Sequence, residues 1–364
     1  MIKPNTPYYI SGEAFSKEDL IQYCKQKHTD EGIEKFEKEI FQFILDWFSP
    51  SDYMEVKTSG STGKPKKIHL QKKHMEASAR ATIFFFDLKP NDKILHCLPM
   101  HFIAGKMMVV RALVGSLDLY CIEPSSKLEF IPEQIDFAAM IPFQVSKLVS
   151  KEEGRRALSK IEKLIIGGSF MSADLINRLQ NISTQVWQTY GMTETITHIA
   201  LRKANGKDKS DWYTTLPGVS ANLDNRGCLI ISADDIGVSK LITNDLAEIL
   251  ETGGFKIMGR VDNMIISGGI KYNPEEIERK LSGTIPNDYF IGGLNDNELG
   301  QKLVLFIEDE GALKRKVFDV WEMIEGKLTK LEIPKEIIFV PSFSRTTSGK
   351  IDRKATMIKL EVSE

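Results

Sequence analysis

The sequence predicts an α/β protein with a large N-terminal domain of parallel αβ layers, a small β-rich subdomain and a small α+β C-terminal domain. Buried strand signals alternate with helical ones up to about residue 200, which indicates an open, largely parallel sheet. Short strands separated by turn residues follow. From residue 263 onward the strand and helix signals mix again, over about a hundred residues, which is a usual domain size.

The first part of the chain supplies the αβ layers. Residues 31–48 carry apolar side chains at three-to-four spacing and predict an amphipathic helix. The short strand signal MEVKTS runs into a loop, and a helix is expected from about 74 to 86. Further buried strands are indicated by ILHCLPM, SLDLYCI, FAAMIPF and KLIIGG, and further helices by FQVSKLVSKEEGRRAL and SADLINRLQ.

The same kinds of signal predict the helices and strands after about residue 200. The β-rich subdomain is indicated by RGCLIIS, SKLITNDLAEIL and GGFKIMGRVDNMIIS. A helix begins in NPEEIERKL, where Asn273 is the expected N-cap and Pro274 occupies the first turn. Strands are expected at YFIGGL, KLVLFIE and EIIFVP, with a helix from about 313 to 329. We place the joint near 259–263 and predict domains at 1–261 and 262–364.

Composition narrows the classes of partner. The 364 residues are 42% hydrophobic and 27% charged, as in an ordinary globular protein, and the net charge of −2 suggests neither nucleic acid nor an anionic membrane as partner. No signal peptide is recognisable, and the most apolar stretch, 107–113, contains Arg111, so no membrane anchor is expected. The four cysteines match no metal-ligand spacing and suggest reduced thiols of a cytoplasmic protein. A homo-oligomer is compatible with these features.

A loop rich in hydroxyl groups and glycine, TSGSTGKPKK, occupies residues 58–67. Its glycines let the backbone approach an anion, and their N–H groups can form a nest for phosphate oxygens. Hydroxyl groups and the lysines that follow add donors and charge. The segment is no Walker A loop, because the Gly-Lys pair is misplaced and no Ser or Thr follows the lysine. Its composition alone also fits a flexible linker.

Four further segments carry candidate chemistry. In QTYGMTETITH (188–198), Tyr190 offers a ring for stacking, and Thr193 with Glu194 forms an oxygen pair suited to Mg²⁺ on phosphates; a solvated polar turn is the alternative. In TNDLAEI (243–249), Asp245 is expected in a turn, where it could accept both hydroxyls of a ribose or be an ordinary turn aspartate.

The pair Arg260 and Asp262 lies at the inferred joint and could equally be a surface ion pair. In SRTTSGKIDRK (344–354), Lys350 would ordinarily be a solvated charge. A lysine that docks into a site between domains could instead stabilise developing negative charge.

Taken in order, these segments resemble the signature motifs of the adenylate-forming superfamily, which comprises acyl-CoA synthetases, adenylation domains of nonribosomal peptide synthesis and luciferases. The resemblance extends from about residue 56 to 354. The patterns TSG[ST]TGxPK, YGxTE, GRxD and RTxxGKIxR match throughout, and ISGG follows GRxD. The usual TGDLA departs from the pattern at one position, where Asn244 replaces glycine.

The resemblance implies a role for each matching residue. Thr193 would touch the α-phosphate of ATP, Glu194 would hold Mg²⁺, and Lys350 would reach the substrate carboxylate and the α-phosphate during adenylation. Asp262 would be the hinge about which the small domain rotates for thioester formation. The implied ATP-binding residues are Thr58, Ser59, Gly60, Ser61, Thr62, Gly63, Lys66, Tyr190, Gly191, Asp245 and Arg260, and the implied channel for CoA is formed by Gly268, Gly269 and Lys271.

The substrate is indicated by two features. The first is a short N-terminal part, since only about 57 residues precede the phosphate loop, fewer than in a typical family member. The second is the stretch LPMHFIAGKMMVVRALVG at residues 98–115, which resembles the LPxxxIAGxxxxxR stretch of the o-succinylbenzoate–CoA ligases of menaquinone biosynthesis. Many of those relatives have histidine where this chain has Phe102. A second carboxylate in the substrate requires a cation or a donor in the pocket. The candidate residues of the acyl pocket are His101, Lys106, Arg111, Gly167, Gly168, Ser169, Thr195 and His198.

The expected reaction is activation of a carboxylic acid to its acyl-AMP with release of pyrophosphate, followed by transfer to CoA with release of AMP. It would use ATP, Mg²⁺ and coenzyme A, and o-succinylbenzoate is the favoured acid. Three alternatives stay open. They are another aryl- or acyl-CoA ligase, a stand-alone enzyme that loads a carrier protein, and a non-catalytic nucleotide-binding protein. The presence of Lys350 and Glu194 argues against the last.

Overall fold

The computed structural model describes residues 6–57, 67–125, 128, 134–309, 317–346 and 351–361. The chain divides into two compact units, which we treat separately. Unit 1 comprises Met1–Met171, Leu175–Ser220 and Ile231–Leu241, and unit 2 comprises Ser172–Asp174, Ala221–Ile230 and Ile242–Glu364.

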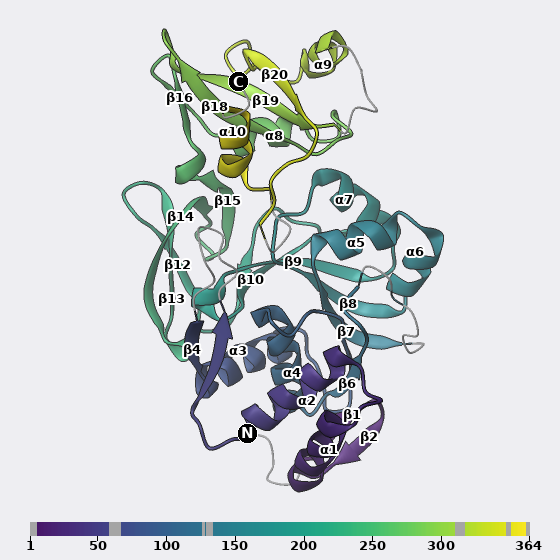
Figure 1. The fold of residues 1–364 in the computed structure, drawn as a ribbon. Coiled ribbons are helices and arrows are strands. Elements are labelled where there is room, and N and C mark those ends of the chain that lie inside the picture. The colour runs from purple at the N-terminus through teal and green to yellow at the C-terminus, as the bar shows by residue number, and fades with distance from the viewer. Residues whose placement is uncertain are drawn as a thin grey trace. The chain divides into compact units, whose positions relative to one another are not determined.

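Unit 1 is built on a nine-stranded sheet with the strand order β11-β10-β9-β8-β7-β5-β6-β1-β2 (Figure 1). The run from β9 to β1 is parallel, and only β10, β11 and β2 pair antiparallel, so the predicted parallel αβ domain is confirmed. The strands are β1 (Tyr8–Ile10), β2 (Glu13–Phe15), β5 (Lys93–His96), β6 (Asp118–Cys121), β7 (Ile135–Met140), β8 (Ile161–Ile166), β9 (Gln185–Gly191), β10 (His198–Lys203) and β11 (Thr214–Thr215).

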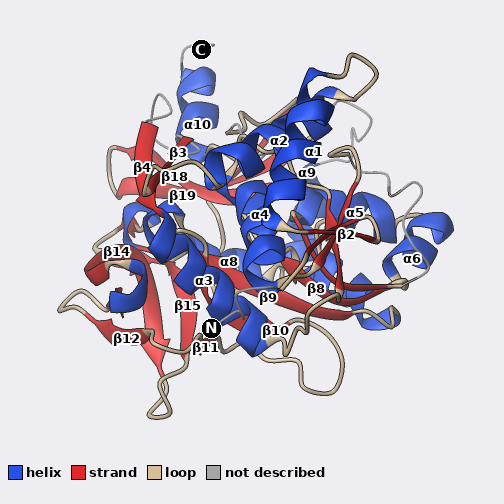
Figure 2. Ribbon diagram, turned by 90° about the horizontal axis from the view of Figure 1, so that it is seen from below, coloured by secondary structure: helices blue, strands red, loops and turns tan. Residues whose placement is uncertain are grey.

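Helices cover both faces of this sheet because side chains alternate along each strand. Ile94 and Phe137 point into a core shared with α1–α4, whereas their neighbours Leu95 and Ala138 point into a core shared with α5–α7. The two groups of helices can be followed in Figures 1 and 2. The helices are α1 (Lys17–Thr29), α2 (Lys35–Trp47), α3 (Lys72–Phe85), α4 (Ile103–Gly115), α5 (Pro142–Val149), α6 (Glu152–Leu158) and α7 (Ala173–Arg178).

Two local predictions in unit 1 need correction. The segment predicted as one helix over 143–158 is broken into α5 and α6, and a β-carbon on Gly154 would lie 2.2 Å from the carbonyl oxygen of Leu148. The phosphate loop joins β3 (Tyr53–Lys57) to β4 (Lys67–Gln71), which pair antiparallel. The strand β4 was not predicted, whereas the helix expected from about 74 to 86 is confirmed as α3, which follows β4.

The predicted β-rich subdomain is confirmed as a four-stranded sheet in the order β12-β13-β14-β15. Its strands are β12 (Ser220–Leu223), β13 (Cys228–Ala233), β14 (Val238–Ile249) and β15 (Phe255–Arg260). The prediction that Asp245 lies in a turn is wrong. It lies within β14, directly opposite Arg260 of β15, because the strand continues through the polar residues that looked like its end.

The last part of unit 2 is a five-stranded sheet in the order β17-β16-β19-β18, with β20 on the other side of β19. Helices α8 and α9 pack on one face, and α10 packs on the other. The elements are β16 (Ile265–Ser267), β17 (Ile270–Tyr272), α8 (Pro274–Lys280), β18 (Tyr289–Asp296), β19 (Gly300–Glu308), α9 (Val317–Ile324), β20 (Glu336–Val340) and α10 (Arg353–Glu361).

The predicted start of α8 is confirmed, since the side-chain oxygen of Asn273 accepts the N–H of Glu275 at 3.1 Å, with Pro274 in the first turn. Within the described part of the chain, no helix has the length and apolar character needed to cross a bilayer.

Candidate active site

Several predicted segments of unit 1 leave the sheet at the same edge. The LPMHF segment follows β5, the Gly167-Gly168 turn follows β8, and Thr193 and Glu194 follow β9. These strands are parallel, so their carboxyl ends meet on one side of the sheet, where open α/β sheets bind their ligands. The topology therefore gathers these segments from distant parts of the sequence.

Glycine is required at two of these strand ends. A β-carbon on Gly167 would lie 2.4 Å from the hydroxyl oxygen of Thr189 on the neighbouring strand, and Gly168 has a φ of +86°. A β-carbon on Gly191 would lie 2.3 Å from the carbonyl oxygen of Thr197. The chain can make both close turns only without a side chain at these positions.

The turn after β9 is held by its own polar groups. Thr193–Thr195 form a short 3₁₀ helix, and the buried hydroxyl of Thr195 accepts the N–H of Met192 at 3.0 Å and lies 2.8 Å from the carbonyl oxygen of Thr197. Ile196 has a φ of +66°, which is strained for a β-branched residue. Such strain concentrates at functional sites. Thr195 shapes the turn, and Glu194 is left exposed at its tip.

The side chain of Tyr190 is only 7% exposed and packs edge-on against Tyr213, with ring centroids 5.9 Å apart. It therefore forms part of a wall rather than an open platform for stacking.

Arg111 on α4 is the largest of the fully buried side chains. Its Nη1 lies 3.6 Å from the sulfur of Met108, and its Nε and Nη2 have no hydrogen-bond partner among the described residues. Burial lowers the pKa of Arg111 to about 9. An arginine buried without a carboxylate is costly, and a group placed at such a cost is a candidate for binding an anionic ligand.

His198, at the start of β10, lies close enough to Arg111 for the charge of the guanidinium to affect its pKa. Burial, and then the charge of Arg111, hold the pKa of His198 well below its ordinary value, so the ring is neutral at neutral pH. Its Nε2 lies 3.2 Å from the hydroxyl of Thr82 on α3, which donates to the carbonyl oxygen of Ser78. The other ring nitrogen, Nδ1, has no partner in the described part of the chain. Arg111 rather than His198 is thus the group suited to a carboxylate.

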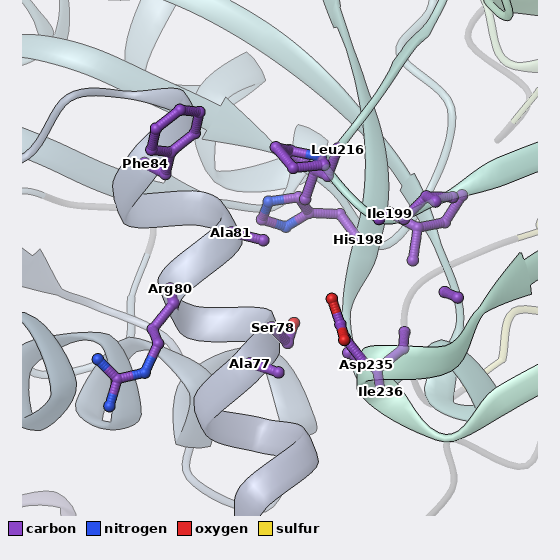
Figure 3. Close-up of a pocket in the computed structure, with 14 residues that line it drawn as sticks. Ala77, Ser78, Arg80, Ala81, Phe84, His198, Ile199, Leu216, Asp235 and Ile236 are labelled. Atoms are coloured by element: carbon purple, nitrogen blue, oxygen red, sulfur yellow. The ribbon is translucent and has the colours of Figure 1, made fainter. Parts of the chain in front are cut away.

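A cavity of about 350 Å³ lies beside His198 within unit 1 (Figure 3). Its wall is formed by α3, the start of β10, and residues 216–219 and 233–236. Figure 3 shows the imidazole lying between Ala81 of α3 and Leu216. Arg111 is not among the lining residues, so the cavity adjoins the buried cluster through His198.

The remaining acyl-pocket candidates are placed differently. The ammonium of Lys106 donates to the carbonyl oxygen of Glu55 at 3.2 Å and lies over the ring of Phe43. His101 is exposed and contacts the ring of Phe102. Ser169 is half-buried beside Gly168. Among these polar candidates, only Arg111 combines a buried charge with donors that have no partner in the described ranges of the chain.

No group of three or more metal-ligating side chains occurs among the described residues. Mg²⁺ in phosphate chemistry is commonly held by one or two carboxylates together with the substrate phosphates and waters. The single exposed carboxylate of Glu194 fits that arrangement.

Unit 2 contains the candidate ribose-binding pair. Arg260 donates to Asp245 at 2.8 Å and to Asp262 at 2.8 Å, and its hydrogen bond holds the pKa of Asp262 below the ordinary value. The side-chain amide of Asn244 donates to both oxygens of Asp262, at 2.9 and 3.2 Å, and its oxygen accepts from Arg226. The residue at which this chain departs from the TGDLA pattern therefore contacts the candidate hinge residue.

The predicted CoA-channel residues lie on an exposed hairpin of unit 2. Gly268 and Gly269 connect β16 to β17 with φ values of +56° and +79°. Two central residues with positive φ are typical of a type I′ hairpin, which favours glycine. Lys271 is exposed on β17.

Two parts of the predicted site, Thr58–Lys66 and Lys350, lie outside the described residues. Conversely, Thr82 and the contact made by Asn244 were not predicted from the sequence. The buried face of α3, which includes Met75, Ala79 and Thr82, could have indicated the first, and the departure from glycine the second.

Comparison with known proteins identifies the family of the chain. The AMP-binding enzyme family matches residues 45–228, just over half of the chain. An acyl-CoA synthetase (AMP-forming)/AMP-acid ligase II-like protein from Dyadobacter fermentans has a crystal structure similar to this chain, with a TM-score of 0.61 and 32% identity. That similarity covers 93% of this chain and 98% of the other.

Two relatives are named for their substrates. The 2-succinylbenzoate–CoA ligase of Salmonella typhimurium is 27% identical over 316 residues, covering 82% of this chain and 67% of its own. The indoleacetate–CoA ligase of Aromatoleum aromaticum is 24% identical over 329 residues, covering 81% of this chain and 64% of its own.

Proposed function

We propose that this chain, which belongs to the AMP-binding enzyme family, is an AMP-forming ligase that joins an aromatic carboxylic acid to coenzyme A, and that its acid is o-succinylbenzoate. The relatives include both a 2-succinylbenzoate ligase and an indoleacetate ligase, so similarity alone supports an aromatic acid without choosing between them.

The buried cation of Arg111 is the observation that favours o-succinylbenzoate. This acid has one carboxylate that reacts and a second one on the ring that does not. Burial of the second carboxylate requires a cation or several donors. Arg111 offers Nε and Nη2, which have no partner among the described residues, and a guanidinium matches the geometry of a carboxylate. Indoleacetate has no second carboxylate and would leave this charge uncompensated.

The first half-reaction brings a carboxylate to the α-phosphate of ATP, so two anions must be held in line. In the proposed site, the loop Thr58–Lys66 holds the β- and γ-phosphates, Thr193 contacts the α-phosphate, and Lys350 bridges the two reacting groups. Mg²⁺ held by Glu194 would neutralise phosphate charge when bound. Tyr190 and Gly191 line the adenine site, and Asp245 with Arg260 holds the ribose hydroxyls.

The second half-reaction requires the thiol of CoA to reach the acyl carbon. We propose the domain division 1–261 and 262–364, with Asp262 as hinge, so that Lys350 leaves and the hairpin with Gly268, Gly269 and Lys271 approaches. This is a hinge transition in which one site serves two reactions. The contacts of Asp262 with Arg260 and Asn244 support a defined backbone position in one of the two states.

The hinge gives a testable expectation for Asp262→Pro. Proline fixes φ, and this substitution also removes the carboxylate that contacts Arg260 and Asn244. We expect one half-reaction to fall by about tenfold or more while the other stays near normal, because one arrangement is trapped. Pyrophosphate exchange and thioester formation from supplied acyl-adenylate are measured separately. Normal rates in both would place the hinge elsewhere, and Asp262→Ala separates loss of the carboxylate from the effect of proline.

The function itself is tested by release of pyrophosphate on mixing the protein with ATP, Mg²⁺ and a panel of acids. The panel contains o-succinylbenzoate, 4-oxo-4-phenylbutanoate, indoleacetate, benzoate and a medium-chain fatty acid. We expect o-succinylbenzoate to have the highest kcat/KM. A higher value for an acid without a second carboxylate would assign the protein to another aryl- or acyl-CoA ligase. No release with any acid would contradict the ligase assignment.

A further inference from the structure

Two arginines of unit 2 flank the segment that carries Lys350. Arg345 precedes it, and its guanidinium donates to Asp288 at 2.8 Å and to Glu308. Arg345 also forms an isolated antiparallel bridge with Ile351, so the residues on either side of 346–350 are paired with each other. The two residues that border this short segment are thus held together by backbone pairing.

Arg353 follows the segment, and its side chain is more deeply buried than that of Arg345. Its Nη2 donates to the carboxylate of Glu278 at 2.9 Å, and its Nη1 lies 3.4 Å from the carbonyl oxygen of Ile291 on β18. The Glu278 side chain is 18% exposed, and its second oxygen accepts the N–H of Ile291 at 2.8 Å. Glu278 therefore joins the start of α10 to β18 through one carboxylate.

Backbone contacts complete this arrangement. The N–H of Asp352 donates to the carbonyl oxygen of Ser344 at 2.8 Å, and the N–H of Ser344 donates to the buried hydroxyl of Thr356 at 3.0 Å. The N–H of Phe343 donates to Glu308, the same carboxylate that holds Arg345. Glu278 thus binds Arg353 and the backbone N–H of Ile291 on β18. Glu308 binds Arg345 and the backbone N–H of Phe343.

We infer that Glu278 and Glu308 are positioning residues for adenylation, which hold the two flanks of the segment from which Lys350 acts through Arg353 and Arg345. The inference rests on the proposed function, in which Lys350 serves the first half-reaction alone. A lysine has a long flexible side chain, so the precision of its ammonium depends on where its backbone is held. Misplacement of a reacting group by about 1 Å can cost on the order of a hundredfold in rate.

The test compares Glu278→Gln with the matched control Glu336→Gln. The control breaks the ion pair between Lys302 and Glu336, 2.7 Å long, which joins β19 to β20 in the same sheet. We expect Glu278→Gln to slow pyrophosphate exchange by about tenfold to a hundredfold. Thioester formation from supplied acyl-adenylate should stay within about twofold, and the control should stay within about twofold in both assays, as expected for a partly exposed ion pair.

A merely structural role would slow both half-reactions of Glu278→Gln alike, and either that result or unchanged adenylation would overturn the inference. Thermal unfolding checks that each variant is folded. Glu308→Gln carries the same expectation and replaces Glu278→Gln should the latter fail to fold.

A second readout separates this inference from the proposed function. Trypsin cleaves after lysine, and the rate of cleavage between Lys350 and Ile351 is followed by mass spectrometry. We expect faster cleavage in Glu278→Gln than in Glu336→Gln, because Arg353 then keeps only its weaker contacts with Glu275, 3.6 Å away, and with the carbonyl oxygen of Ile291, 3.4 Å away, and one flank of the segment is held less firmly. Should the unaltered protein activate no acid, the proposed function fails, and equal cleavage rates would then overturn the positioning role as well.

Discussion

Lys350→Ala is expected to reduce adenylation by on the order of a hundredfold or more, the usual cost of removing a donor from a developing negative charge. Thioester formation from supplied acyl-adenylate should be largely intact, because in the proposed reaction Lys350 has left the site by then. Pyrophosphate exchange measures the first half-reaction, and appearance of the CoA thioester measures the second.

The control for this substitution is Lys330→Ala, which removes an exposed lysine of the same unit. It should leave both half-reactions unchanged, since surface charges of this kind contribute little. An equal loss of both half-reactions in Lys350→Ala would contradict the division of labour between two arrangements of one site.

The fold could be predicted from the sequence wherever the order of apolar and polar residues within one segment determines its structure. Alternation of apolar strands and amphipathic helices is sufficient for the parallel sheet, and Asn273 before Pro274 is sufficient for the start of α8. The β4 strand was missed because KIHLQ has few apolar residues, and its pairing with β3 is not evident from either segment alone. The break between α5 and α6 involves Gly154 approaching the backbone of Leu148, a contact that no periodicity records.

The position of Asp245 shows a similar limit. Thr243, Asn244 and Asp245 have the composition of a turn, yet the strand continues through them. The hydroxyl of Thr243 donates to the carbonyl oxygen of Leu229 on β13, and Asp245 pairs with Arg260 on β15. Partners on both neighbouring strands satisfy these polar groups, so tertiary contacts override the local preference for a turn.

The residues of the candidate site also fall into two groups, those that a contiguous motif identifies and those that only contacts between distant segments identify. Motifs such as YGMTE are contiguous, so their residues could be named from the sequence and compared with a family pattern. The burial of Arg111 and its lack of a partner for Nε and Nη2 among the described residues could not be predicted, because both depend on every element that surrounds the side chain. Its neighbour His198 is bonded to Thr82, which is 116 positions away in the chain. The family resemblance and side-chain polarity suggested eight acyl-pocket candidates, and burial together with hydrogen bonding distinguishes Arg111 among them.

Arg111→Met is expected to abolish most of the preference for o-succinylbenzoate. Methionine keeps an unbranched apolar side chain and removes the guanidinium. Loss of one partner of a buried charge pair costs about 2–5 kcal/mol, so kcat/KM for o-succinylbenzoate should fall between about thirtyfold and several thousandfold. The value for 4-oxo-4-phenylbutanoate, which lacks the ring carboxylate, should change little or rise. The ratio of the two kcat/KM values is the decisive measurement, because a general defect in adenylation would lower both.

Because Arg111 is buried without a carboxylate among the described residues, Arg111→Met should leave the free energy of unfolding unchanged or raise it by about 1 kcal/mol or more, measured without ligand. Lys106→Met removes the other cation of α4, whose ammonium reaches the carbonyl oxygen of Glu55, and should preserve the preference between the two acids. If the Lys106 variant lost that preference while the Arg111 variant kept it, the second carboxylate would bind at Lys106. If both variants kept it, neither cation would recognise the ring carboxylate, and the case for o-succinylbenzoate would lose its structural support.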